Sequence, residues 1–149
     1  MLIRRDRGLV AVSIMLDVAF HAGRAATVNA GDIAERLGLA RRGMEPLLQA
    51  LSRAGLLESV RGPRGGYRLG RPRRDIRLDE ILAVALAEEA EPSDGPQGRL
   101  QTEVLDRLWN ELEDQLRTRL AALTLDDLIR RAAAAGLRRP TAEPISFAI

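Results

Sequence analysis

The sequence has 149 residues, of which 46% are hydrophobic and only 3% aromatic, which predicts one compact domain with an aliphatic, mainly helical core. Its 23 basic residues, all arginines, nearly balance 21 acidic residues, for a net charge of +2. With no cysteine, one histidine and no apolar run near the roughly 20 residues that span a membrane, the sequence excludes disulfides, cysteine metal sites and a membrane-spanning helix. No signal peptide precedes the first helix pattern, so we expect a soluble, cytoplasmic protein with no cofactor.

Three helices are expected in the first third of the chain. Residues 8–21 form a nearly continuous apolar run, interrupted by Asp17, whose Ala, Leu and Met content favours a buried helix. A second helix over 30–37 is preceded by a capping asparagine and ended by a glycine. A third begins at Arg41 or Arg42, extends to residue 54 and is followed by another glycine. Two short helices joined by a tight glycine-containing turn predict a helix-turn-helix.

A β-hairpin is expected directly after these helices. Residues 56–60 predict a short strand, residues 61–66 form a turn with three glycines and one proline, and residues 67–69 predict the returning strand. A hairpin that follows a helix-turn-helix is a wing. Two acidic residues then open a short helix that extends to residue 86.

The second half of the chain contains the longest helical pattern. Residues 89–98 are nearly free of apolar side chains and predict a linker or mobile loop before a helix over 100–122. This helix is too long for so small a chain to cover on both flanks, so it predicts a homodimer; the alternative is that it folds back over its own domain. Its expected dimerisation residues are Val104, Leu105, Leu108, Trp109, Leu112, Leu116 and Leu120. Thr124 caps a last short helix that ends before Gly136.

Charge is distributed unevenly between the two halves. Residues 1–77 carry 15 arginines against 7 acidic residues, a net of +8, whereas residues 78–149 carry 8 against 14, a net of −6. The first half is therefore expected to bind a polyanion, although a compositionally biased genome would also explain the absence of lysine. The predicted organisation is a DNA-binding region over 1–77, a connecting helix over 78–88, a mobile loop over 89–98, dimerisation helices over 99–136 and a loose tail over 137–149.

Several segments resemble the Rrf2 family of bacterial winged-helix transcription regulators. The most specific is VRGPRGGYRL (60–69), which is similar to the family's wing signature, and AVSIMLDVA (11–19) is similar to its first helix. LWNELEDQL (108–116) and LTLDDLI (123–129) resemble its dimerisation helix and the turn that follows. The resemblance implies a dimer that binds a partly palindromic operator, usually as a repressor, and many members sense iron–sulfur status, nitric oxide or redox state.

The resemblance does not extend to an iron–sulfur cluster. In members that hold one, three cysteines lie in the loop before the long helix and at its start. Here the corresponding region contains Glu91, Asp94, Gln97, Glu103 and Asp106 and no cysteine or histidine. Oxygen ligands alone hold such clusters poorly, so we expect a member without a cluster or metal site, whose signal is open.

The expected DNA contacts lie in the third helix, the wing and the N-terminus. In a winged helix, the third helix enters the major groove with its first turn near the base edges, and a glycine-rich wing approaches phosphates or the minor groove. The candidates are Arg41, Arg42, Glu45 and Gln49 on the helix, Arg61, Gly62, Pro63, Arg64 and Gly65 in the wing, and Arg5 and Arg7 before the first helix. Alternatively, Glu45 only complements the helix dipole, the wing is a plain tight turn and the N-terminal arginines are solvated. Nonspecific phosphate attraction is further expected from Arg68, Arg71, Arg73 and Arg74.

These observations predict a homodimeric regulator, expected to be a repressor, that binds palindromic double-stranded DNA. The alternative is a winged-helix adaptor that docks a partner protein without binding DNA. An enzyme is not supported, because no nucleophile–base set or metal-ligand spacing is present. The sequence does not identify an effector, and Trp109 could line a pocket for one between protomers.

Overall fold

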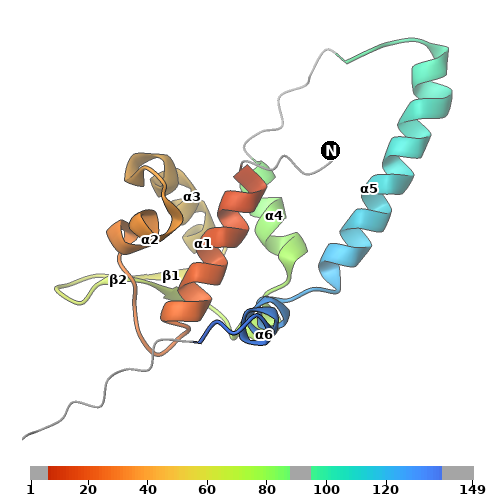
Figure 1. Ribbon diagram of the computed structural model, residues 1–149. Coiled ribbons are helices and arrows are strands. Elements are labelled where there is room, and N and C mark those ends of the chain that lie inside the picture. The colour runs from red at the N-terminus through yellow and green to blue at the C-terminus, as the bar shows by residue number, and fades with distance from the viewer. Residues whose placement is uncertain (1–6, 88–94, 139–149) are drawn as a thin grey trace, which may run out of the picture.

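The computed structural model describes residues 7–87 and 95–138, and these are mainly helical with one antiparallel hairpin, as predicted (Figure 1). The elements in chain order are α1 (Arg7–His21), α2 (Ala30–Leu37), α3 (Arg41–Arg53), β1 (Leu57–Val60), β2 (Gly66–Leu69), a 3-10 helix (Arg73–Asp75), α4 (Leu78–Leu86), a π-helical turn (Gln101–Leu105), α5 (Asp106–Ala121) and α6 (Leu125–Ala134). No described helix is long and apolar enough to cross a membrane.

The body of the molecule is built around α1, which packs against α2, α4, α6 and β2. Ile14 and Met15 of α1 are fully buried and share one core with Ile33 of α2, Leu48 of α3 and Ile81 of α4. Leu125 and Ile129 of α6 belong to the same core. The helix spacing of these apolar residues explains why each helix buries one face.

The expected boundaries of α2 are confirmed by its caps. The Asn29 side chain accepts a hydrogen bond of 2.8 Å from the Asp32 N–H, which satisfies a donor of the first turn. Gly38 ends the helix with φ of +66°, a left-handed conformation that favours glycine. The turn between α2 and α3 is therefore specified by local chemistry.

Asp17 is buried on α1 and is compensated by an arginine from α2. Only 8% of Asp17 is exposed, and its carboxylate accepts hydrogen bonds of 2.9 and 2.8 Å from Arg36 Nε and Nη2. This hydrogen bond raises the pKa of Arg36, and His21 Nε2 lies 3.6 Å from the same carboxylate. The pair joins α1 to the first helix of the helix-turn-helix and thereby orients it on the core.

The wing is a short hairpin whose base is buried. Leu57 of β1 faces Leu69 of β2, and both are buried at the end nearest the core. Its outer end is tied to the loop between α1 and α2 by two backbone hydrogen bonds between Val28 and Tyr67, of 2.9 and 2.7 Å. Val28 thus adds an isolated β-bridge beside β2, which supports a hairpin that would be marginal alone.

A second set of backbone contacts joins the segment after the wing to α6. The Leu78 N–H donates to the Leu123 carbonyl at 2.9 Å, and the Leu125 N–H donates to the Ile76 carbonyl at 3.0 Å. Arg77 and Thr124 lie opposite each other between these bonds. The 3-10 helix in this segment was not predicted, because three residues show no periodicity.

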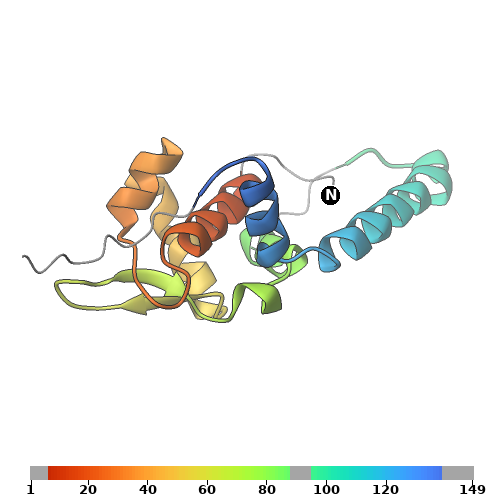
Figure 2. The same cartoon turned by 60° about the horizontal axis from the view of Figure 1, so that its bottom comes forward.

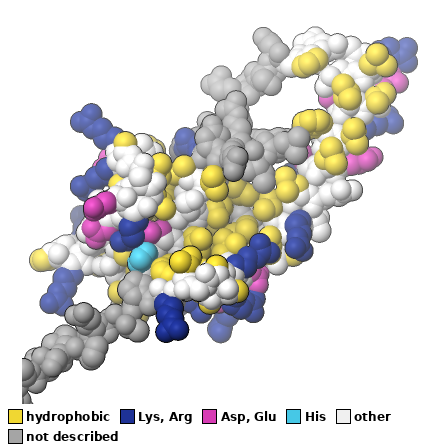
Figure 3. Space-filling view, viewed as in Figure 1, with side chains coloured by type: hydrophobic (Ala, Val, Ile, Leu, Met, Phe, Trp, Pro, Cys, Tyr) yellow, Lys and Arg dark blue, Asp and Glu magenta, His cyan; other side chains and the backbone are white. Residues whose placement is uncertain are grey.

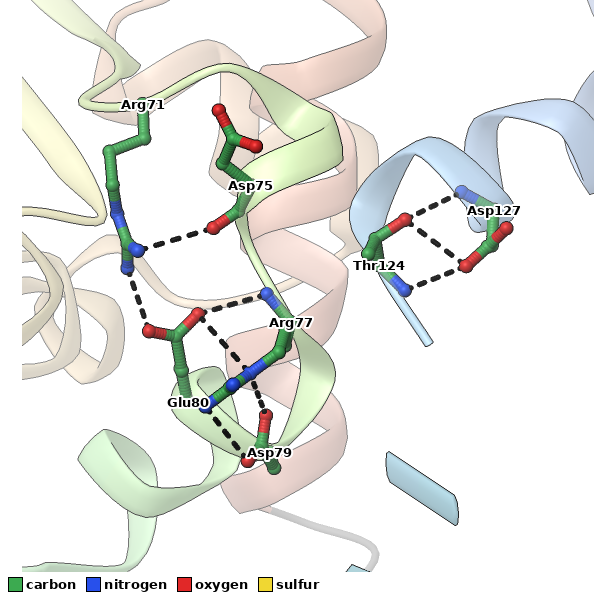
Figure 4. Close-up of polar contacts among 7 residues, drawn as sticks. All are labelled: Arg71, Asp75, Arg77, Asp79, Glu80, Thr124 and Asp127. Atoms are coloured by element: carbon green, nitrogen blue, oxygen red, sulfur yellow. Dashed lines mark hydrogen bonds and ion pairs between the residues drawn. The ribbon is translucent and has the colours of Figure 1, made fainter. Parts of the chain in front are cut away.

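Side chains cap both helices that begin at this junction (Figure 4). The Glu80 carboxylate accepts from the Arg77 N–H at 3.0 Å and from Arg71 Nη2 at 3.1 Å. The Thr124 hydroxyl accepts from the Asp127 N–H, and Asp127 accepts from the Thr124 N–H, so the cap predicted at Thr124 is confirmed as a reciprocal capping box.

The long helix is not regular over 100–122 as expected, because its start is π-helical from Gln101 to Leu105 before α5 begins. Figures 1 and 2 show that α5 extends away from the body at the end that lies opposite the wing. The N-terminal turns of this helix thus do not fold back over their own domain, whereas its last turns pack against α4. Apolar side chains remain exposed along it (Figure 3).

Some predictions fall outside the described residues. They are Arg5, most of the loop over 89–98 with Glu91 and Asp94, and most of the tail over 137–149. The division into the segments 1–77 and 99–136 stays a prediction. In the structure, α6 packs against α1 in the body core, and Leu120 of α5 packs on the same core.

Candidate nucleic-acid interface

The third helix exposes one polar face. Arg41, Arg42, Glu45 and Gln49 are exposed, whereas Met44, Leu47, Leu48 and Leu51 are buried on the other side. Arg41 Nε lies 3.9 Å from Glu45 Oε1, a long contact that leaves both groups available.

Pro46 lies inside α3, beyond its first turn. The bond that its missing N–H would make to the Arg42 carbonyl cannot form. That carbonyl lies at the exposed start of the helix, where water can solvate it.

Glycines shape the tip of the wing. Gly62 has φ of +111°, and the Gly65 N–H donates to its carbonyl at 2.9 Å. A Cβ at Gly65 would lie 2.5 Å from the Val60 carbonyl oxygen, so no other residue fits there without moving the backbone. Arg61, Pro63 and Arg64 are exposed around this turn. The tight turn therefore presents two arginines at its tip.

The structure brings α3 and the wing together around one open depression. Arg41, Glu45 and Gln49 line one side of it, and Gly62 and Gly65 line the other. Residues separated by as many as 24 positions in the sequence thus form a continuous surface. Figure 2 shows the wing and the α2–α3 pair at the same end of the body.

Carboxylates already compensate several of the expected arginines. Arg68 pairs with Glu58 across the wing at 2.9 Å, Arg71 with Glu80 at 3.1 Å and Arg73 with Asp126 at 2.6 Å. Hydrogen bonds from Arg68 lower the pKa of Glu58, and the same bonds raise the pKa of Arg68. These three arginines therefore make contacts within the fold. Because carboxylates neutralise their charge, they can contribute less to the phosphate attraction expected of them.

By contrast, no ion pair among the described residues involves Arg42, Arg61 or Arg64. Exposed guanidinium groups without a carboxylate partner are available to bind phosphate or guanine. These three arginines lie on α3 and at the wing tip. Sequence reasoning selected all three but could not separate them from the compensated ones.

The N-terminal candidate Arg7 is the first residue of α1, is partly buried and has an interaction within the protein. Figure 1 places the start of α1 beside α4 and away from the wing. The structure therefore does not bring Arg7 together with the α3–wing surface.

The predicted dimerisation residues fall into two groups. Val104, Leu105, Leu108, Trp109 and Leu112 are exposed, with exposed fractions from 56% down to 38%. Leu116 and Leu120 are partly buried and line a shallow apolar groove between α5 and α4, and Leu120 packs on the body core. The first group is therefore the more exposed to a partner.

The described residues contain no group of three or more His, Cys, Asp or Glu side chains that could hold a metal ion. Glu103 instead accepts from Arg99 at 3.0 Å, and Asp106 accepts from Gln101 at 2.8 Å. These acidic side chains thus make local contacts along the start of the long helix.

Comparisons with known proteins agree with this geometry. Residues 5–131 match the sequence model of the Rrf2 family, described as an iron-dependent transcriptional regulator. The transcriptional regulator IscR of Pectobacterium atrosepticum is 36% identical over 129 residues, which cover 83% of this chain and 77% of the relative. The solved structure of T. potens IscR superimposes with a TM-score of 0.74 at 32% identity and covers 91% of this chain and 92% of that one. The cysteine regulator CymR of B. subtilis has a TM-score of 0.70 at 26% identity, covering 88% and 98%.

Proposed function

Because this chain belongs to the Rrf2 family of helix-turn-helix transcription regulators, and is therefore not an enzyme, we propose that it represses transcription as a homodimer bound to a palindromic operator. The single observation that carries the proposal is the depression between α3 and the wing, which Arg41, Glu45 and Gly62 line. Arg42, Arg61 and Arg64, which have no ion pair among the described residues, lie exposed on the same two elements.

The recognition helix would read bases in the major groove. An arginine at the start of α3 can donate two hydrogen bonds to guanine O6 and N7, and Glu45 can accept from a cytosine amine. Pro46 lies on the exposed side of the helix and offers no polar group to a base. This combination favours G·C pairs opposite the first turn of α3.

The wing would bind the neighbouring minor groove. Its tip carries Arg61 and Arg64 on a turn narrow enough for close approach to the backbone. Arginine is attracted to narrow minor grooves, where the negative potential is enhanced. The wing therefore adds shape recognition to the base contacts of α3.

Two copies would be joined through α5. Its exposed apolar side chains extend over two turns, which is unusual for a surface helix that has no partner. A two-fold dimer places two recognition helices about 34 Å apart, which predicts half-sites separated by one turn of DNA. Because two-fold symmetry relates the two half-sites as an inverted repeat, the operator is expected to be a palindrome.

The family description is that of an iron-dependent regulator, but the residues present do not fit the iron–sulfur cluster that the family resemblance implies for many members. The chain has no cysteine, and its one histidine, His21, lies beside the buried pair of Asp17 and Arg36. We therefore propose regulation without a cysteine-held cluster. If the proposal is right, treatment with an iron chelator will leave operator affinity unchanged, and a loss of binding would contradict it.

Selection of duplexes from a random DNA pool tests the proposed function. We expect a palindromic consensus with half-site centres about 10 base pairs apart. Affinity for the selected duplex should fall steeply with salt, and Arg61→Ala should lower it about 5- to 100-fold if Arg61 makes a specific contact. A pool that shows no enrichment over bulk DNA would refute DNA recognition, and binding of single copies to half-sites would refute the dimer. Increased expression of a promoter carrying the selected duplex would contradict repression.

A further inference from the structure

The tip of the wing has a contact that the hairpin itself does not provide. The Thr27 hydroxyl, in the loop between α1 and α2, donates a hydrogen bond of 2.7 Å to the Arg64 carbonyl. Thr27 and Arg64 are 37 positions apart in the sequence. Among the described residues, no other hydrogen bond ties residues 61–65 to a different element of the fold.

The neighbouring contacts explain why this bond has a fixed geometry. Next to Thr27, Val28 exchanges two backbone hydrogen bonds with Tyr67. At Gly66 an added Cβ would lie 2.4 Å from the Val28 carbonyl oxygen, so the loop and β2 are in close contact. The Thr27 side chain therefore reaches the turn from a backbone that is already held in place.

We infer that Thr27 is a positioning residue for DNA binding, which acts by fixing the backbone of Arg64 at the wing tip. The inference rests on the proposed function, since it assumes that Arg64 contacts DNA. A turn held only by its own two strands samples many orientations, and immobilising it on DNA costs conformational entropy. The Thr27 hydrogen bond restricts the Arg64 backbone before DNA binds, so part of that cost is met during folding.

Two substitutions at the same position separate the hydroxyl from the shape of the side chain. Thr27→Val keeps the branched shape and removes the donor, and it should weaken binding to the selected duplex about 2- to 10-fold, as expected for one net hydrogen bond. Thr27→Ser keeps the donor and should bind within about twofold of the wild type. Thr118→Val is the matched control, because the Thr118 hydroxyl bonds within α5 to the Asp114 carbonyl at 2.9 Å. It should leave DNA affinity unchanged.

A double-mutant cycle with Arg64→Ala tests whether Thr27 acts through Arg64. Thr27→Val should have no further effect on affinity once the Arg64 side chain is absent. An equal effect in both backgrounds would overturn the inference, and so would unchanged affinity in Thr27→Val alone. Thermal unfolding of each variant, with recovery of binding in Thr27→Ser, distinguishes positioning from loss of the fold. If the wild type itself selects no duplex, the proposed function fails; if it does, and Thr27→Val binds equally well, only this inference fails.

Discussion

Replacing Leu108 by alanine should weaken the homodimer, because Leu108 lies in the middle of the exposed apolar side chains of α5. The structure leaves 46% of this leucine exposed in a single copy. Complete burial of a leucine side chain is worth about 1.5–3 kcal/mol, so covering the remaining half contributes about 0.7–1.5 kcal/mol. Two-fold symmetry places the substitution twice in each dimer, which brings the expected loss to about 1–3 kcal/mol.

This loss corresponds to a dimer dissociation constant that rises roughly 5- to 150-fold. Sedimentation velocity over a dilution series measures it directly. Asn110→Ala is the control, because residue 110 lies two positions from Leu108 and therefore on the far side of the same helix. If the Leu108→Ala protein had the same dimer dissociation constant as the wild type, α5 would not be the dimer interface. A wild type that is monomeric at every concentration would refute dimerisation altogether.

Three further predictions concern the fold that supports the interface. Asp17→Asn should lower the free energy of unfolding by about 2 kcal/mol, measured by urea denaturation, because it leaves Arg36 with a weaker partner; Asp114→Asn, at an exposed pair, is the control and should change little. Gly70→Ala should lower the free energy of unfolding by about 1–3 kcal/mol, because the added Cβ would lie 2.2 Å from the Gly55 carbonyl oxygen. Gly43→Ala, in the helix α3 at a position where the added Cβ meets no other atom, should raise the free energy of unfolding by up to about 1 kcal/mol. Burial raises the pKa of Glu80, but hydrogen bonds from the Arg77 N–H and Arg71 outweigh it and lower that pKa below its ordinary value. Its stabilising effect is therefore present at neutral pH and is lost as the pH falls below 4.5, so Glu80→Gln should flatten this part of the pH dependence of unfolding; an unchanged profile would refute the assignment.

Local chemistry made much of the fold predictable from the sequence. The cap at Asn29, the left-handed Gly38 and the glycine-rich turn at 62–66 are signals that operate over a few residues, and the structure places helix ends and the wing at these positions. The polar face of α3 was predictable for the same reason, since its buried leucines follow the helix period. The candidate interface was therefore found from sequence because both of its parts are local motifs.

Contacts between distant residues could not be predicted in this way. Nothing in the sequence indicates that Asp17 pairs with Arg36, although an acidic residue in a buried helix does require some partner. The bond between Thr27 and Arg64 carries no local signal at all. Likewise, Arg64 and Arg68 are both arginines of the wing segment. Only the position of Glu58 on the opposite strand shows that Arg68 is paired with a carboxylate. The π-helical turn was missed because its apolar spacing looks like that of an ordinary helix.

The paired backbone bonds at Ile76–Leu78 and Leu123–Leu125 have a mechanical consequence. They join the start of α6 to the start of α4, and Leu120 near the end of α5 packs on the same core. The C-terminal end of α5 is therefore held against the body, while its N-terminal turns extend away from it (Figure 1). If two copies pair through the exposed side chains of α5, as proposed, the tilt of this helix relative to the body would set the distance between the two α3–wing surfaces on DNA. A signal that changed this tilt by a few degrees would shift these surfaces out of phase with the double helix without altering any residue proposed to touch a base.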